Sequence, residues 1–357
     1  MACPRWVVVC LVMLGACTSS PGPGRAPSIS DTGPLPSEPT PSVASQITLT
    51  LELSEPPVEW REVAFLPAGD ADDQIGIDRC YHCEAVTPAA LAVGPDGSYW
   101  IGDAVKHRIA HFGQDGSFLG AIDTVVGPAD LAFAGDRLFA LLRTGGRTVT
   151  RVPKDGDLEE IVVTLDGKVR HVQALVGGQD RLTAVIAGAE RALGRYWAVA
   201  FIDEKTGVLS PAPGVAVSGD TWIDLVPLIG KRPPAFEVRW LDGTTITQVS
   251  QVTMQAIRNG SPVRTTVGDT FVRTATENRA AAIGSMRSAA WYLEIPADGG
   301  RPTLERIPYS GFIGDLMLSL SVGPDGRVYW MQLKNDGPPQ VPSRWRPSCL
   351  ATRRLRS

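Results

Sequence analysis

The chain lacks the short motifs that mark many common enzyme classes. It has no Gly-x-Ser-x-Gly nucleophile elbow, no Walker-type phosphate loop and no Gly-x-Gly-x-x-Gly dinucleotide fingerprint. It contains only 4 histidines, and none of them lies in a His-Glu-x-x-His spacing for zinc. These absences exclude the familiar hydrolase, nucleotidase and dinucleotide patterns, and no reaction is indicated by a motif.

An excess of positive charge and long apolar runs are also missing. The chain has 34 Lys and Arg against 38 Asp and Glu, which gives a net charge of −4 at pH 7. Nucleic-acid-binding domains carry a basic face, so this balance argues against a nucleic-acid partner. After the N-terminus, no apolar run approaches the roughly 18 residues of a transmembrane helix. The sequence therefore predicts a globular body without a membrane span.

Residues 1–17 have the pattern of an export signal. Arg5 precedes an apolar run from Trp6 to Leu14, and small residues lead to Leu14-Gly15-Ala16-Cys17. This ending resembles the lipobox of bacterial lipoproteins. The resemblance implies a signal peptide over residues 1–16, acylation of Cys17 with chains such as palmitate, and anchoring to the extracytoplasmic side of the cell membrane. The alternative is an ordinary signal peptide that happens to hold a cysteine.

The composition divides the remaining chain into three parts. Residues 17–45 are rich in Pro, Ser, Gly and Thr, so they predict a disordered tether that holds the body away from the bilayer. Residues 46–350 have the composition of a folded domain. Residues 351–357 form a basic C-terminal tail, which we expect to be a frayed end rather than a binding segment.

The clearest structural signal lies between residues 89 and 122. Four short β-forming runs occupy residues 91–93, 99–101, 109–112 and 118–122, with Asp-Gly turns between the first and second and between the third and fourth. Asp-Gly between such runs is a strong hairpin signal, because glycine adopts positive φ at little cost. Four antiparallel strands in sequence predict one blade of a β-propeller. The residues Pro95-Asp96-Gly97, Ile101-Gly102-Asp103 and His107-Arg108-Ile109 resemble an NHL repeat.

A distant repeat extends this prediction to the whole body. Val93-Gly94-Pro95-Asp96-Gly97, followed by Tyr99-Trp100, recurs as Val322-Gly323-Pro324-Asp325-Gly326, followed by Tyr329-Trp330. Because the two copies lie near opposite ends, repeats should fill the chain between them. We predict an all-β, six-bladed propeller of four-stranded antiparallel blades, with seven blades as the alternative. Strand patterns at residues 46–53 and 58–66 are expected to close the last blade.

Weaker copies mark the units between these two. The second unit starts near residue 131, and the third, fourth and fifth are expected over residues 169–210, 220–267 and 269–308. In the fourth unit we take residues 222–228 as the first strand. The sixth unit is expected to begin at Asp315.

Cysteine spacing leaves several interpretations open. Cys80-Tyr81-His82-Cys83 is a CxxC pair, and Cys349 is the one other cysteine after Cys17. Exported proteins usually oxidise their cysteines, so we favour a disulfide from Cys349 to Cys80 or Cys83, or one within the CxxC. A redox pair or a zinc site that includes His82 are the alternatives.

Polar residues occur where the innermost strand of each expected blade begins, which would place them at the mouth of the central tunnel. They are Asp130, His171, Asp224, Asp269 and Asp315. We expect no cofactor, although carboxylates around one axis are ligands that calcium accepts, and zinc is the other candidate metal. The resemblance implies that propeller enzymes such as lactonases and amidating lyases work from this location. We favour the interpretation that these residues cap turns and hydrate the tunnel mouth, with the binding or catalytic role as the alternative.

Asp103 and His107 have the residue types of an acid–base pair. Within the resemblance, however, both occupy repeat positions that tie neighbouring strands of a blade, so we favour a structural role. Taken together, the sequence favours a membrane-anchored binding module for a protein, peptide or glycan at the cell envelope. The alternatives are a metal-dependent propeller hydrolase or lyase, and a redox protein that uses Cys80 and Cys83.

Overall fold

A computed structural model shows a body built from β-strands and turns. All described residues belong to one compact unit, Pro41–Ser357. No helix among them is long and apolar enough to cross a bilayer. The structure describes residues 46–353 except 54–60, 78–87, 89, 144–147, 154–157, 165–170, 179–180, 188–196, 219, 229–234, 259–260, 264–270, 277–278, 287–288, 308–319, 325–326, 332–333, 336–344 and 347–348. The expected signal peptide and tether therefore lie outside the described residues.

The first sheet is the predicted four-stranded antiparallel meander. Its strands are β3 (Ala90–Val93), β4 (Tyr99–Asp103), β5 (Arg108–Phe112) and β6 (Phe118–Asp123). Its two Asp-Gly turns have the same construction. Gly97 and Gly116 adopt φ values of 80° and 82°, and each preceding Asp accepts hydrogen bonds from the N–H and hydroxyl of the following Ser. Local turn chemistry thus fixes the hairpins.

Three further sheets repeat the four-stranded antiparallel order. The second contains β7 (Pro128–Ala134), β8 (Arg137–Leu142), β9 (Thr148–Val152) and β10 (Glu159–Val162). The third contains β11 (His171–Gly177), β12 (Leu182–Ala187), β13 (Trp197–Ile202) and β14 (Leu209–Pro211). The fifth contains β20 (Phe271–Thr276), β21 (Arg279–Met286), β22 (Ala289–Pro296) and β23 (Thr303–Ile307).

The fourth sheet differs from the prediction in two ways. It has six strands: β15 (Val215–Ser218), β16 (Thr221–Leu228), β17 (Ala235–Asp242), β18 (Thr245–Arg258), β19 (Ser261–Val263) and β1 (Gln46–Leu53). The innermost strand is therefore β15, and the expected first strand is the second. In addition, β1 pairs in parallel with β18, so residues 46–53 extend the fourth sheet instead of closing the last one.

The last sheet is closed by the other N-terminal strand, as predicted. Its order is β2 (Arg61–Phe65), β28 (Cys349–Arg353), β25 (Val328–Met331) and β24 (Leu320–Val322). A separate ribbon pairs β26 (Lys334–Asn335) with β27 (Trp345–Arg346). The repeated tyrosines lie together, with the rings of Tyr99 and Tyr329 5.9 Å apart, so the last sheet packs on the first. Strand β28 also runs past the predicted end of the body at residue 350.

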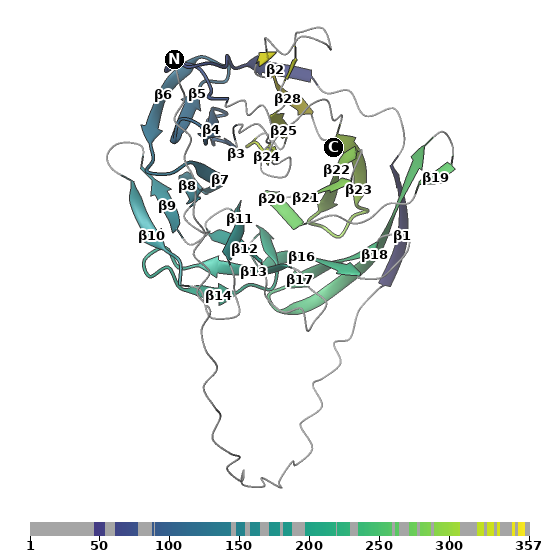
Figure 1. Ribbon diagram of the computed structural model, residues 1–357. Helices are drawn as coiled ribbons and strands as arrows, with labels where there is room; N and C mark the ends of the chain where they lie inside the picture. Colours follow the sequence, from purple (N-terminus) through teal and green to yellow (C-terminus); the bar gives the residue numbers. More distant parts are fainter. Residues whose placement is uncertain are drawn as a thin grey trace, which may run out of the picture. The chain divides into compact units, whose positions relative to one another are not determined.

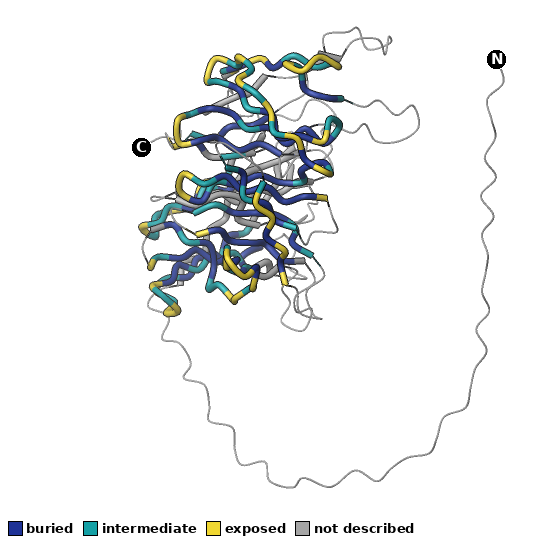
Figure 2. Tube along the Cα trace, turned by 90° about the vertical axis from the view of Figure 1, so that its left-hand side faces the viewer, coloured by how far each residue is buried: buried dark blue, intermediate teal, exposed yellow. Residues whose placement is uncertain are grey.

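The innermost strands connect the sheets into a closed ring. Strand β3 contacts β7 and β24, β7 contacts β11, and β20 contacts β11, β15 and β24 (Figure 1). The chain is therefore an all-β propeller, whose described residues form six sheets of four or more strands. Buried residues follow the strands and exposed ones gather at the turns (Figure 2). Apolar clusters between neighbouring sheets form the core.

Candidate functional site

The predicted tunnel-mouth residue Asp130 joins two neighbouring sheets. It lies in β7 and its side chain is fully buried. One carboxylate oxygen accepts a hydrogen bond from Leu131 N at 2.8 Å, and the other accepts from Leu175 N, in β11, at 2.7 Å. One carboxylate thus accepts hydrogen bonds from the backbones of both sheets, so Asp130 connects the second sheet to the third.

His171 lies on the side of the third sheet that faces away from the second. It begins β11 and is paired with Ala187 of β12. Its neighbours along β12, Ile186 and Ala184, point toward the second sheet, where they pack in a shared apolar cluster. Side chains alternate along a strand, so residue 187 and His171 occupy the opposite face. The His171 Nε2 atom lies 2.9 Å from Gln173 Oε1.

Asp224 lies one strand farther from the axis than the sequence predicted. It is the fourth residue of β16, the second strand of its sheet, and its cross-strand partner is Arg239 of β17. The Asp224 Oδ2 and Arg239 Nη1 atoms are 4.0 Å apart. Two residues before Asp224, Trp222 contacts Phe201 of the third sheet, with ring centroids 5.2 Å apart. Asp224 and His171 therefore lie on the facing surfaces of the third and fourth sheets, whereas Asp130 lies between the second and third.

Most of the other predicted residues cannot be placed relative to this arrangement. Asp269, Asp315, Cys17, Cys80 and Cys83 lie outside the described residues. Cys349 begins β28, where its backbone pairs with Phe65 of β2. Within the described ranges, no group of three or more His, Cys, Asp or Glu side chains is placed to hold a metal ion. The disulfide and the metal site both stay predictions.

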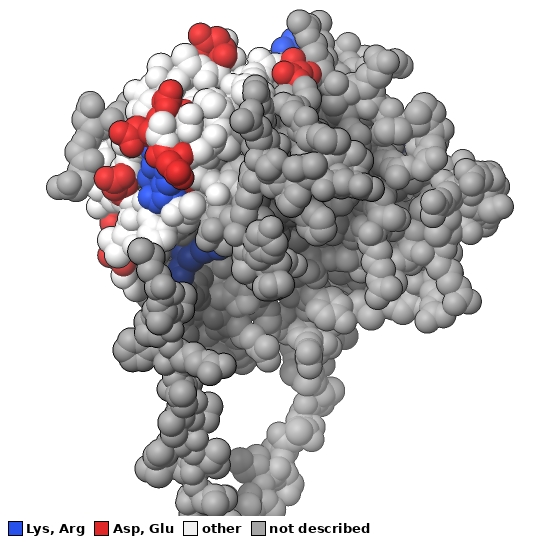
Figure 3. Space-filling model, turned by 45° about the horizontal axis from the view of Figure 1, so that its top comes forward, with Lys and Arg blue, Asp and Glu red and all other residues white. Residues whose placement is uncertain are grey.

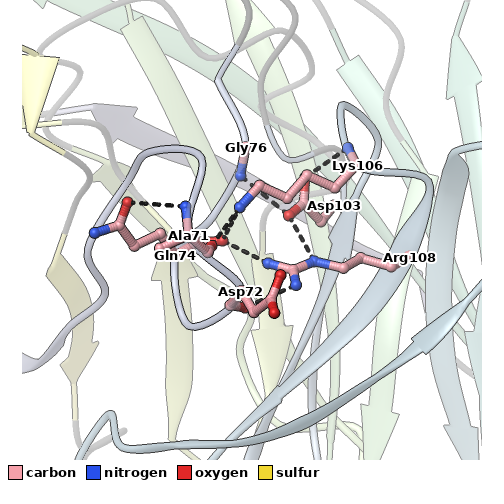
Figure 4. Close-up of polar contacts among 7 residues, drawn as sticks. All are labelled: Ala71, Asp72, Gln74, Gly76, Asp103, Lys106 and Arg108. Atoms are coloured by element: carbon pink, nitrogen blue, oxygen red, sulfur yellow. Dashed lines mark hydrogen bonds and ion pairs between the residues drawn. The ribbon is translucent and has the colours of Figure 1, made fainter.

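Asp103 is the centre of a buried polar cluster at the β4–β5 turn (Figure 4). Its Oδ2 accepts hydrogen bonds from Gly76 N at 3.0 Å and Arg108 Nε at 3.2 Å, and its Oδ1 accepts from Lys106 N at 3.2 Å. The Arg108 guanidinium continues outward and donates to the backbone oxygens of Asp72 and Gln74. The cluster thus clamps the segment that follows β2 onto the first sheet.

Two neighbours of Asp103 complete this clamp. Lys106 Nζ donates to the backbone oxygens of Ala71 and Gln74. Partial burial, with the nearby Arg108 charge, lowers the pKa of Lys106. His107 has an exposed side chain and a φ of 51°, and its backbone oxygen accepts from Thr124 N at 2.7 Å. The three hydrogen bonds to the Asp103 carboxylate are donated by Gly76, Lys106 and Arg108, which hold the two segments together. This agrees with the structural role expected for this repeat position.

A stacked aromatic pair on the first sheet was not among the predicted site residues. The rings of Trp100 and His111 lie 3.8 Å apart and nearly parallel, and Trp100 also meets Phe133 of the second sheet edge-on. Partial burial lowers the pKa of His111, while the Asp96 charge opposes that shift. Strand register brings Trp100 opposite His111. That register depends on the connection between β4 and β5 at residues 104–107, which contains no Asp-Gly turn.

A second missed group surrounds Arg239 on the fourth sheet. Arg239 Nε and Nη2 donate to Glu237 Oε2 at 3.1 and 2.6 Å, and Asp224 lies on the next strand. Alternation within the Phe236–Leu241 run suggested a strand, but only the pairing of β16 with β17 joins the three charges. Elsewhere, acidic and basic side chains are interspersed on the described part of the face drawn in Figure 3.

Comparison with protein families gives one match. A model described as a domain of unknown function (DUF7485) matches residues 58–138. This segment covers β2, the Asp103 clamp and the first sheet, and it is less than half of the chain. A search of curated proteins finds no match.

Three solved structures of similar architecture are distant from this chain in sequence. A streptogramin B lyase is 13% identical over 73% of this chain and 76% of its own, with a TM-score of 0.36. A gluconolactonase from Xanthomonas campestris is 13% identical over 84% and 98%, with a TM-score of 0.40. A protein from Bacteroides fragilis, described as exported, is 10% identical over 80% and 88%, with a TM-score of 0.39. Likenesses at this level carry no conclusion about activity.

Proposed function

We propose that this protein is a non-catalytic β-propeller lipoprotein that binds a ligand at the extracytoplasmic side of the cell membrane. The proposal rests on Leu14-Gly15-Ala16-Cys17, which resembles a lipobox and is followed by a Pro- and Ser-rich tether. Acyl chains on Cys17 contribute about 0.8 kcal/mol per buried CH₂, so more than one chain anchors a protein stably. The tether then leads directly into β1 at the edge of the fourth sheet.

The binding role is supported by how the body uses its buried carboxylates. Asp103 and Asp130 are both fully buried, and their oxygens accept hydrogen bonds from backbone N–H groups and from Arg108. A catalytic acid or base must reach a reacting group, and these two contact the fold. A rigid ring of packed sheets is instead suited to presenting a preformed binding surface.

The anchoring part is tested by metabolic labelling of the full-length protein with a palmitate analogue in a bacterial host. We expect label on the wild-type protein and none on Cys17→Ala. The matched control is Cys10→Ala, which removes a cysteine from the apolar run and leaves the lipobox intact. Labelling of Cys17→Ala at the wild-type level would refute the lipoprotein assignment.

A further inference from the structure

Strand β6 is the outer strand of the first sheet, and its free edge is apolar. Within the described part of the chain, β6 pairs with β5 alone (Figure 1). The run from Phe118 to Ile122 contains no charged residue and no proline. A bulge in the β5–β6 pairing leaves Leu119 without a cross-strand partner, and its side chain is 57% exposed. An uncharged strand edge of this kind can pair with a further strand.

The backbone of β6 presents hydrogen-bonding groups to the outside of the sheet. Thr124 N, just after the strand, donates to His107 O at 2.7 Å and so points toward β5. The direction of the amides alternates along an antiparallel strand, so the N–H and C=O groups of Ala121 and Asp123 point away from β5. No other described strand pairs with that side of β6. These groups are therefore available to an added strand.

The outer strands of the other described sheets carry features that oppose such pairing. Strand β10 begins with two exposed glutamates, β14 ends in a proline, and β2 and β23 each contain an acidic residue beside a basic one. Charges and proline at an edge oppose the addition of a strand. The fourth sheet differs, because its outer strand β1 is itself an extended segment added in parallel from the N-terminus. An edge of this propeller thus already accepts a remote segment, and β6 lacks the features that would prevent it.

Acidic side chains flank the free edge of β6 at both ends. Asp123 is the last residue of the strand, Asp115 lies in the turn before it, and both are exposed. The hydroxyl and the N–H of Ser117 donate to Asp115 and lower the pKa of that carboxyl, so it is ionised at neutral pH. The one lysine and the one arginine of the first sheet and its turns, Lys106 and Arg108, both donate to backbone oxygens in the clamp (Figure 4). The edge therefore favours a positively charged partner.

We propose that the free edge of β6 binds an extended segment of another polypeptide that has basic residues on either side of an apolar centre. The added strand pairs with the outward N–H and C=O groups of Ala121 and Asp123, and its apolar side chains cover Leu119. Its basic ends meet Asp115 and Asp123. A second copy of this chain would bring its own acidic ends to the edge, so like charges oppose that pairing. The inference rests on the proposed binding function and names its ligand class.

The test is fluorescence anisotropy of the full-length protein in detergent with the fluorescein-labelled peptide Lys-Val-Thr-Val-Thr-Val-Lys, for which we expect saturable binding. Ala121→Pro removes an outward N–H and no hydrogen bond to β5, so it should weaken binding at least about tenfold. The matched control is Ala121→Ser, which keeps the N–H and should bind like wild type. Asp123→Asn should weaken binding about threefold, and a peptide with glutamate in place of both lysines should bind at least about tenfold more weakly.

Circular dichroism shows whether each variant is folded. If Ala121→Pro is not, the lysine peptide methylated on its central amide nitrogens decides, because it cannot donate to the edge and should bind at least about tenfold more weakly. The proposal is overturned if the lysine peptide fails to bind, if the deciding variant or peptide leaves binding unchanged, or if the glutamate peptide binds equally well. A wild-type dimer that Ala121→Pro dissociates in sedimentation would also overturn it, in favour of a second copy.

The two proposals can fail separately. If the peptide does not bind but the wild-type protein is labelled at Cys17, the inference about β6 fails and the membrane anchor stands. If the wild-type protein takes up no label, the anchor is refuted whichever way the peptide behaves.

Discussion

Replacing Asp103 with alanine removes the acceptor at the centre of the clamp on the first sheet. Asp103 is fully buried and its ion-pair partner Arg108 keeps only 7% of its side-chain exposure. Breaking a buried ion pair from one side costs about 3–5 kcal/mol, because a buried charge loses its partner. The N–H of Gly76 is left without its acceptor as well, so we place Asp103→Ala near the upper end of that range.

Replacing Asp103 with asparagine should lower the free energy of unfolding by a smaller amount. Its amide oxygen still accepts from Arg108 and Gly76, but without the charge, so we expect a loss of about 2 kcal/mol. The assay is urea unfolding followed by tryptophan fluorescence, combined with hydrogen exchange of residues 66–77, which should lose protection first. The control is Asp136→Ala, at an exposed turn position where the side chain makes no hydrogen bond to the described part of the chain. An Asp103→Ala protein as stable as wild type would refute the clamp.

Three further perturbations test other parts of the fold. Asp130→Ala removes two buried hydrogen bonds to a charged acceptor, one of them between sheets, so the unfolding free energy measured in urea should fall by about 2–5 kcal/mol. No change would contradict its role between sheets. A Cβ on Gly177 would overlap the backbone oxygen of Phe133 in β7, so Gly177→Ala should lower the free energy of unfolding by about 3 kcal/mol. The control is Gly178→Ala, where the nearest atom to the added Cβ is 3.3 Å away and the loss should be much smaller. Because burial lowers the pKa of His111 below its ordinary 6.5, the unfolded chain binds more protons and stability should decline as pH falls below that value. His111→Gln should flatten this decline in urea midpoints measured from pH 7.5 to 5.5, and an unchanged slope would show that another group causes it.

Much of the first and last sheets could be predicted because their signals are local. Each Asp-Gly turn specifies its own hairpin, so β3 to β6 fall close to the expected runs. The Tyr99 and Tyr329 copies also lie in adjacent sheets, as the repeat implied. In the fourth sheet the signal was weaker. The short strand β15 has no Asp-Gly turn before it, and the sequence therefore suggested that β16 came first.

The candidate site was predicted only in part, because a site depends on register. Asp130, His171 and Asp224 were chosen for their place at the start of strands, and the structure separates the first from the other two. Glu237 and Arg239 are not predicted site residues, because no motif in the sequence points to them. Their significance appears only when β16 and β17 pair and bring Asp224 beside Arg239.

The sequence by itself determined the strands of the first sheet and their Asp-Gly turns, because these depend on residues close together in the chain. The repeat near the two ends of the chain indicated that an N-terminal strand closes the last sheet. Tertiary structure alone decided where β1 pairs and which carboxylates are buried. Strand β1 finds its partner β18 about two hundred residues away. A pairing of that kind depends on which edge the folded ring leaves free, and no local propensity encodes it.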